Sequence, residues 1–347
     1  MQGGLYVTSK QGFLCSPLII KDRHSSAEGR GDFMSLKYEI TKLGLENMDG
    51  SNNTSVKQMK ANCRRFSEWS CENGYNKLNK ILETGKERVL QEYSNYLIEK
   101  ELSPVTIHTY LAAPCKALDV PMEKIKKPKR TADKITRSRD VSRNEQGRVE
   151  MGESRHQRLV EFQGAVGVRR SELAKLKGKN LVVDEAGKLC VEVERGKGGK
   201  YQLQRILPCD IETVKSCFEG TGKDEYVFKS TELRNKIDLH RIRAEHAQRA
   251  YTYYSSLDFS EKKKLVNELK MRWLATHPQC DKNSWQYTKW LEQMTKGGGV
   301  YVLRGANYDR AIQNNRPTRY NRVALMAVSM FHLSHYRLGV AVVNYLV

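Results

Sequence analysis

Apolar side chains recur at three- and four-residue steps through the first third of the chain, a spacing that predicts amphipathic helices. The runs cover residues 56–69, 89–98 and 105–111. Ser103 suits the position that caps the last of these helices, while Pro114 is expected to kink or end it. The pattern predicts a small helical domain over residues 36–125, with its aromatic side chains in the core and not stacked on bases.

The C-terminal part of the chain, from about residue 150 to 347, combines helical periodicity with one alternating segment. Apolar residues alternate in 189–193 and 202–207, on both sides of Gly196-Lys-Gly-Gly, which is typical of a β-hairpin. Helical runs fall at residues 211–218, 240–254, 259–274, 285–294 and 321–332. We therefore predict two domains and a fold that is mainly α with a small antiparallel β-sheet.

The net charge of the chain indicates what kind of partner it binds. Lys and Arg number 60 against 40 Asp and Glu, which gives a formal net charge of +20 over 347 residues. A field of that sign attracts phosphate polyanions, so nucleic acid is the expected partner. Composition alone is also compatible with a ribosome-associated or merely soluble basic protein, and it names no activity.

Other features of the composition indicate a cytoplasmic protein. No apolar run approaches the length that spans a membrane, and Pro17 interrupts the first apolar residues, which lack the form of a secretory signal. The eight cysteines form no Cys-x-x-Cys pair, so we expect reduced thiols and no metal site. Residues 1–33 are expected to form a flexible tail, and Met34 is an alternative start of the protein.

A strongly basic linker, at residues 126–149, separates the two predicted domains. Between Lys126 and Arg143 there are eight basic and two acidic residues, without apolar periodicity. A solvated tether would explain this segment, and so would a tether that follows a DNA backbone, since phosphate contacts need only a high density of positive charge. We favour DNA contacts, from four residues that we call the linker cations: Lys126, Lys127, Lys129 and Arg130.

Four short segments carry the candidate chemistry, in an order that suits DNA cleavage. They are Gly-Val-Arg-Arg-Ser-Glu-Leu at 167–173, Gly-Lys-Gly-Gly-Lys at 196–200, Leu-His-Arg-Ile-Arg at 239–243, and His-Leu-Ser-His-Tyr-Arg at 332–337 followed by Tyr345. Without a metal, cleavage of a phosphodiester needs cations at the nonbridging oxygens and an acid for the leaving alkoxide. Arginine suits the first role and lysine the second, and a tyrosine nucleophile keeps the bond as a reversible phosphodiester.

These segments resemble those of the tyrosine recombinase (phage integrase) family, and the resemblance covers most of the chain. It implies a helical core-binding (SAM-like) DNA-binding domain at 36–125 and an α/β catalytic domain at 150–347. The residues that match the family's motifs are Arg169, Glu172, Lys197, His240, Arg243, His335 and Tyr345.

The resemblance also implies a role for each matching residue. Tyr345 is the nucleophile, and the arginines at 169 and 243 hold the phosphate oxygens together with His335. Lys197 protonates the leaving 5′ oxygen, while His240 accepts or relays the tyrosine proton. Glu172 supports the site from behind. No cofactor and no metal is implied.

Most of these assignments have a rival nearby. The rivals are Arg170 for Arg169, Lys200 for Lys197, and Tyr336 for Tyr345. The Ser-Glu-Leu that follows sets the register in favour of Arg169, and the position near the C-terminus favours Tyr345. Either lysine of the flexible hairpin could act, with Lys197 preferred. Two further histidines, His246 and His332, are expected to pack or to support the site.

Two features depart from the family pattern. His335 stands 95 positions after His240, far more than in compact members, so we expect an insertion at about 255–320. The insertion either packs a small core of its own or contacts DNA or a partner. Only two residues follow Tyr345, so any coupling between protomers is expected to use the tyrosine segment or the insertion.

The function that the resemblance implies is site-specific recombination through a 3′-phosphotyrosyl intermediate, which integrates or excises a mobile element. The implied partners are double-stranded DNA with specific recombination sites, further copies of the chain in a homotetramer on two DNA sites, and an accessory directionality factor, with no membrane. The protein would be cytoplasmic and associated with the nucleoid when bound to DNA. The alternatives are relaxation like that of a type IB topoisomerase and sequence-specific DNA binding without cleavage.

Overall fold

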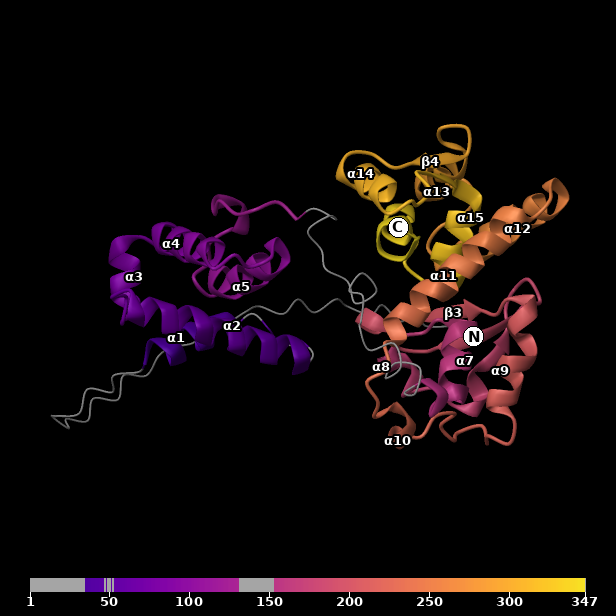
Figure 1. Cartoon of the computed structure of the whole chain (residues 1–347), viewed down its shortest axis with the longest axis horizontal. Helices are drawn as coiled ribbons and strands as arrows, with labels where there is room; N and C mark the ends of the chain where they lie inside the picture. The colour runs from indigo at the N-terminus through magenta and orange to yellow at the C-terminus, as the bar shows by residue number, and fades with distance from the viewer. Residues whose placement is uncertain (1–34, 47, 49–50, 52, 131–152, 347) are drawn as a thin grey trace, which may run out of the picture. The chain divides into compact units, whose positions relative to one another are not determined.

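The computed structural model describes residues 35–46, 48, 51, 53–130 and 153–346 (Figure 1). The protein is mainly helical with small antiparallel sheets, as predicted. It divides into two compact units, one with residues up to Tyr93 together with Tyr110–Ile125, the other with Ser94–Thr109 together with the chain from Lys126 onward. The predicted tail, Met34 and most of the linker lie outside the described residues.

Helices make up the chain before the linker. In order they are α1 (Leu36–Leu45), α2 (Asn53–Glu72), α3 (Leu78–Thr84), α4 (Lys86–Glu99), α5 (Pro104–Ala117) and the short 3-10 turn η1 (Met122–Lys124). The apolar stripe of α2 is buried, and the ring of Tyr93 lies 5.2 Å from that of Phe66 and 5.0 Å from that of Trp69. These aromatic side chains lie in the core, which confirms the prediction from periodicity.

The start of α5 agrees with its sequence, but its end does not. Ser103 Oγ accepts a hydrogen bond from the amide of Thr106 at 3.2 Å and so caps the helix as predicted. Pro114 does not end the helix, which continues to Ala117. A proline removes one backbone donor, and here that loss is outweighed by the buried apolar side chains on either side of it, such as Leu111 and Leu118.

The second unit contains a three-stranded antiparallel sheet of order β1-β2-β3. Its strands are β1 (Leu181–Val183), β2 (Leu189–Val193) and β3 (Gln202–Arg205). Strands β2 and β3 are the arms of the predicted hairpin, with Val193 opposite Gln202. The other elements, apart from those of the insertion, are α7 (Gln157–Val166), α8 (Arg170–Leu173), η3 (Gly178–Asn180), η4 (Lys197–Gly199), η5 (Pro208–Asp210), α9 (Ile211–Phe218), α10 (Ser230–Leu233), α11 (Leu239–Ser256), α15 (Arg322–Ala327), η6 (Val328–His332), α16 (Leu338–Ala341) and η7 (Val342–Leu346).

The predicted insertion does not have a core of its own. It contains α12 (Phe259–Thr276), α13 (Trp285–Thr295), β4 (Val300–Val302), α14 (Ala306–Gln313) and β5 (Arg319–Asn321). Trp273, Trp290 and Leu303 belong to the same buried cluster as Phe331 and Tyr345. The expectation of an independent small core is therefore wrong, because the apolar faces of α12 and α13 pack on α15.

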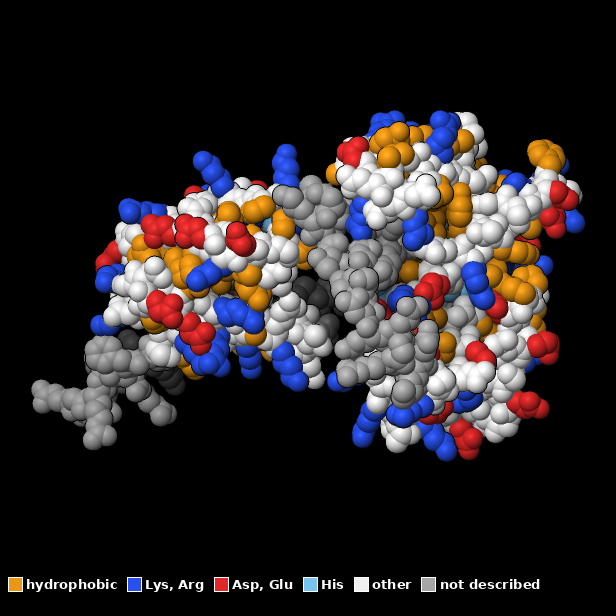
Figure 2. All heavy atoms as spheres, in the orientation of Figure 1, with side chains coloured by type: hydrophobic (Ala, Val, Ile, Leu, Met, Phe, Trp, Pro, Cys, Tyr) orange, Lys and Arg blue, Asp and Glu red, His pale blue; other side chains and the backbone are white. Residues whose placement is uncertain are grey.

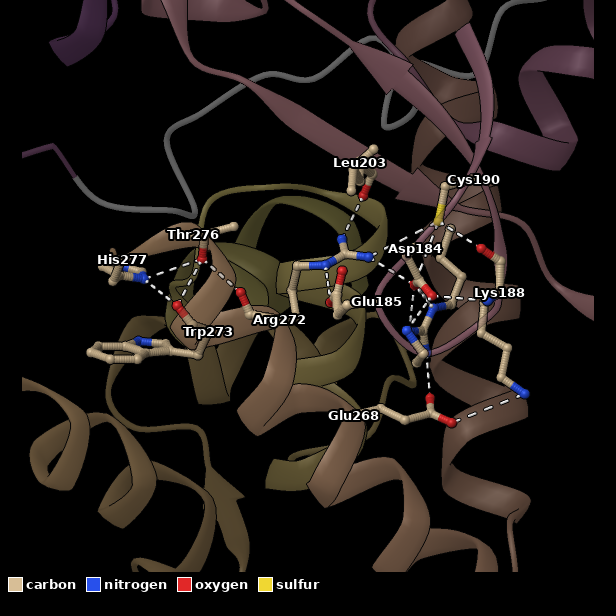
Figure 3. Close-up of polar contacts among 12 residues, drawn as sticks. Asp184, Glu185, Lys188, Cys190, Leu203, Glu268, Arg272, Trp273, Thr276 and His277 are labelled. Atoms are coloured by element: carbon tan, nitrogen blue, oxygen red, sulfur yellow. Dashed lines mark hydrogen bonds and ion pairs between the residues drawn. The ribbon is translucent and has the colours of Figure 1, made fainter. Parts of the chain in front are cut away.

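A buried ionic network joins α12 to the sheet (Figure 3). Asp184, next to β1, accepts hydrogen bonds from Arg205 of β3 at 2.6 Å and from Arg272 of α12 at 2.8 Å, and all three side chains are at most 5% exposed. Burial by itself would raise the pKa of Asp184, but the charges and hydrogen bonds of its partners lower it overall. Glu268 and Glu185 bind the same two arginines. Since breaking a buried ion pair is costly, α12 is firmly attached to the sheet.

Candidate active site

The turn between α7 and α8 positions Arg169. Helix α7 ends at Gly167, whose φ of 67° lies in the left-handed region that favours glycine. A side chain would also not fit there, because a Cβ atom would lie 2.5 Å from Cδ2 of His246. Arg169 then caps α8 in an extended conformation. The glycine of the first motif is therefore required by both the backbone and the packing.

Glu172 collects hydrogen bonds from separate segments of the site. Its carboxylate accepts from Arg169, through the backbone N at 2.8 Å and Nη1 at 2.7 Å, and from Lys197 N and Gln202 Nε2, each at 3.2 Å. The side chain is only 1% exposed. Burial by itself would raise the pKa of Glu172, but the hydrogen bonds and charge of Arg169 outweigh it, with help from the charge of Arg243, and lower the pKa overall. Glu172 is therefore both buried and ionised.

Arg243, in the second turn of α11, is almost completely buried, at 1% exposed. Its guanidinium donates to the carbonyl of Gly167 and, at 3.1 Å, to the carbonyl of Leu333. Its Nε has no hydrogen-bond partner among the described residues. Burial lowers the pKa of Arg243, but an arginine side chain still keeps its charge in a protein. The site thus holds a buried cation with one donor unused.

Tyr345 lies among three of the predicted catalytic side chains. It is on the π-helical turn η7 and is 7% exposed. Its ring centroid lies 5.7 Å from that of His240, 6.1 Å from that of His335 and 5.9 Å from the guanidinium carbon of Arg243. Gln248 of α11 donates to the Tyr345 carbonyl at 3.1 Å and holds this segment against the helix.

His335 is held in one tautomer. Its Nδ1 accepts a hydrogen bond from the amide of Arg337 at 3.3 Å. Burial, together with the positive charges of Arg243, Arg337 and Arg169, lowers the pKa of His335 to about 3. The ring is therefore neutral near pH 7, with its proton on Nε2. This buried N–H has no partner among the described residues, so it can serve an acceptor that binds beside Tyr345.

The glycine hairpin brings Lys197 to the site through its backbone. The amide of Gly196 donates to the carbonyl of Lys200 at 2.8 Å and closes the tip, while the amide of Lys197 donates to Glu172. The side chains of both lysines are exposed. The backbone contact ties Lys197, and not Lys200, to the carboxylate at the centre of the site.

Two of the rival residues have structural contacts. Arg170 donates to the carbonyls of Leu233 at 2.8 Å and Ile237 at 2.5 Å, so it fastens the segment before α11. Tyr336 donates to Thr276 Oγ1 of α12 at 3.0 Å, and burial raises its pKa. Both side chains therefore help to pack the second unit.

The two further histidines form a buried chain of hydrogen bonds. The chain runs from the hydroxyl of Tyr254 to His332 at 3.0 Å, from His332 to His246 at 2.9 Å, and from His246 to the Gly164 carbonyl at 2.7 Å. Because a carbonyl only accepts, each donor in this chain is fixed, with Tyr254 donating first. Burial lowers the pKa of His332, and lowers that of His246 to about 3. Both rings are neutral supports behind Gly167.

Sequence reasoning missed three residues that surround the predicted ones: Gln202, Gln204 and Ser334. The two glutamines are 4% and 0% exposed, and Gln204 donates to Ser334 Oγ at 2.8 Å. The available signal was the spacing of two polar residues at alternate positions of a strand next to the glycine turn. Their partners, 30 and 130 positions away, could not be seen in the sequence.

Only residues up to 130 of the basic linker are described. The carbonyl of Lys126 accepts a hydrogen bond from Ser94 Oγ at 2.9 Å, and the carbonyl of Pro128 lies 2.9 Å from Nε2 of His108. Of the linker cations, Lys127 is half-buried and the other three are exposed. On the visible faces in Figure 2, Lys and Arg side chains are spread over both units and not gathered in one patch.

The described ranges contain no group of His, Cys, Asp and Glu side chains arranged to hold a metal ion. Nor does any helix in them have the length and apolar character to cross a bilayer. The seven cysteines in these ranges are free thiols.

Comparisons with known proteins add little to this geometry. No family model matches the chain, and no curated protein matches it. Among solved structures, the chain is similar to one described as the crystal structure of XerA recombinase, at 16% identity, over 81% of this chain and 99% of that chain, with a TM-score of 0.25. A similarity this low carries no argument about activity, so the case for function rests on the site.

Proposed function

We propose that this protein is a DNA breaking-and-rejoining enzyme that acts as a site-specific recombinase. One observation carries the proposal: Tyr345 lies within about 6 Å of two histidines and a buried arginine, all from the predicted motifs. Two arginines face one carboxylate here, so the charge of the site favours an anion such as a phosphate. The unused donors Arg243 Nε and His335 Nε2 support the same ligand.

In the proposed reaction, the hydroxyl oxygen of Tyr345 attacks the scissile phosphorus and forms a 3′-phosphotyrosyl bond. Its proton passes to His240, whose ring is next to that of the tyrosine. Arg169 and Arg243 hold the nonbridging oxygens as charge develops, and preorganised donors of this kind are usually the largest contribution to catalysis. The bond to the 5′ oxygen breaks, and Lys197 supplies the proton that this oxygen needs as it leaves.

Rejoining is the reverse reaction with a different strand. The 5′ hydroxyl of a partner duplex attacks the phosphotyrosyl bond, a new phosphodiester forms, and Tyr345 recovers its proton. We propose that four copies of the chain carry out these steps on two DNA sites, and that the linker cations contact the DNA backbone. Integration or excision of a mobile element is the proposed outcome.

The test uses duplexes that carry any repeats found in the DNA that flanks the gene, nicked close to the cleavage site so that the covalent complex is trapped. Wild-type protein and Tyr336→Phe should form a complex that survives denaturing gel electrophoresis, and Tyr345→Phe should form none while still binding the duplex. An adduct that persists in Tyr345→Phe contradicts the assignment. Relaxation of a supercoiled plasmid without the repeats would instead favour a topoisomerase, and binding without an adduct would favour a DNA-binding protein.

A further inference from the structure

Two buried glutamines on β3 connect opposite sides of the candidate site. Gln202 and Gln204, which we call the amide ladder, lie two residues apart on the strand and therefore share a face. Gln202 Nε2 donates to Glu172 at 3.2 Å. Gln204 Nε2 donates to Gln202 Oε1 at 3.2 Å and to Ser334 Oγ at 2.8 Å. An unbroken chain of hydrogen bonds thus runs from Glu172 to Ser334.

The carboxylate of Glu172 fixes the orientation of the whole ladder. An ionised carboxylate only accepts hydrogen bonds, so Gln202 must turn its NH2 group toward Glu172. Its carbonyl oxygen then faces Gln204, which must in turn present its own NH2 group there. The second hydrogen of that group is the one that reaches Ser334. Each step has a single consistent arrangement.

Both ends of the ladder meet residues that the proposed reaction uses. At one end, Glu172 holds Arg169 and the amide of Lys197. The hairpin is also tight against the ladder, because a Cβ atom on Gly196 would lie 1.5 Å from Gln202 Nε2. At the other end, Ser334 directly precedes His335. Its φ is 53°, a conformation that few residues other than glycine adopt, so an external hydrogen bond helps to hold it.

The ladder is not explained by stability alone. Gln204 is fully buried, and its Oε1 has no partner among the described residues. A buried acceptor without a partner lowers stability, so an apolar side chain would serve the core better at this position. What a glutamine provides there, and an apolar residue does not, is a directed link to Gln202 and Ser334.

We propose that the amide ladder consists of positioning residues, which fix His335 relative to Arg169 and Lys197. The inference rests on the proposed function for its effect on DNA cleavage. The geometric link itself does not depend on that function, because it predicts the state of the His335 ring in the protein without DNA. This separates the two ideas experimentally.

The first measurement is the imidazole 15N spectrum of histidine-labelled full-length protein, with the His335 signals assigned from their loss in His335→Ala. Wild-type protein should show a neutral ring protonated on Nε2. Gln204→Leu and Ser334→Ala, which cut the ladder at different atoms, should both shift or broaden the His335 signals. Gln313→Leu makes the same change as Gln204→Leu at an exposed position of α14 and should leave them unaltered. Unchanged His335 signals in both ladder variants would overturn the proposal.

The second measurement is the rate of covalent complex formation on the nicked duplex. Small displacements of reacting groups can cost up to about 100-fold in rate, so we expect Gln204→Leu to be slower by roughly 10- to 100-fold, with unchanged DNA affinity. In a His335→Ala background the same substitution should have little further effect. Equal losses in both backgrounds would mean that the ladder does not act through His335. Altered His335 signals in a protein that never forms an adduct would support the link and reject the proposed function.

Discussion

The pair formed by Arg169 and Glu172 allows the structural role of the first arginine to be separated from its chemical role. In Arg169→Ala, the carboxylate of Glu172, which is 1% exposed in the wild-type protein, loses its ion-pair partner. Removing one partner of a buried ion pair costs about 3–5 kcal/mol of unfolding free energy. Glu172 keeps the amide donors of Arg169, Lys197 and Gln202, so we expect the lower end of that range.

The double variant Arg169→Ala/Glu172→Gln should recover part of this loss. The neutral amide of Gln at position 172 needs no cation beside it. However, its NH2 group faces one of the donors that bound the carboxylate, and two donors cannot form a hydrogen bond with each other. Glu172→Gln alone should cost about 1–3 kcal/mol, since it removes a charge-assisted hydrogen bond. We therefore expect a coupling free energy of about 2 kcal/mol between the two positions, because they act as one unit.

The dependence on pH provides an internal check. In wild-type protein the pKa of Glu172 is lowered, so its contribution to stability is present above the ordinary value of 4.5 and is lost as pH falls through the folded pKa. Without Arg169, burial should raise that pKa above its ordinary value, and the folded state then gains from protonation at low pH. The difference in unfolding free energy between wild-type protein and Arg169→Ala should therefore be largest near pH 7 and become smaller toward pH 4.

Urea unfolding, with hydrogen-exchange mass spectrometry of peptides from 157–176, measures these differences in stability in the second unit. Cleavage of the nicked duplex is measured on the same proteins. The double variant should regain stability but remain slower by about 10²–10³-fold, because the cation for the phosphate is still absent. Equal stabilities of Arg169→Ala and the double variant would refute the structural reasoning, and wild-type cleavage by either would remove Arg169 from the active site.

Three further predictions concern other parts of the protein. Cleavage by Lys197→Ala should recover on a substrate whose scissile 5′ oxygen is replaced by sulfur, since a thiolate leaves without a proton. If Lys200→Ala recovers instead, Lys200 and not Lys197 is the general acid. Replacing the four linker cations by Gln should reduce the slope of log K against log salt by up to about 3–4 without changing site preference, and an unchanged slope would leave the linker as a tether. The rings of His246 and His332 are buried and neutral, so below pH 6.5 each should lower the unfolding free energy by about 1.4 kcal/mol for each pH unit, because these histidines bind protons in the unfolded state but not in the folded state. Urea unfolding of His246→Leu at several pH values should show a smaller dependence of the unfolding free energy on pH. An unchanged dependence would contradict the buried neutral state.

The longer helices could be predicted because each carries its own amphipathic pattern. The runs at 211–218 and 259–274 correspond to α9 and α12 within two residues. The short strands β4 and β5 were not predicted, since strands of three residues are held by pairing and by buried contacts such as those of Tyr320. Pro114 does not end α5 for the same reason, because packing around the helix outweighs a local signal.

The grouping of the candidate site residues was predictable to the extent that these residues lie in short motifs. The motifs include Arg169, Arg243, His335 and Tyr345, which the fold brings close together from three separate segments. What the motifs do not contain is the set of contacts between them. The buried position of Arg243 against the Leu333 carbonyl depends on how α11 meets the C-terminal segments, which is a property of the packed domain.

Strand β3 explains why the insertion and the site should be considered together. Its glutamine side chains face Glu172 and Ser334, while its Leu203 carbonyl accepts a hydrogen bond from Arg272 of α12 at 3.1 Å. Arg205, two residues after Leu203, enters the network around Asp184. Strand β3, which carries the amide ladder, is thus anchored by α12 of the predicted insertion. Removing α12 would leave Asp184 with one arginine fewer and expose part of the buried cluster that includes Tyr345, so the predicted insertion helps to support the candidate active site.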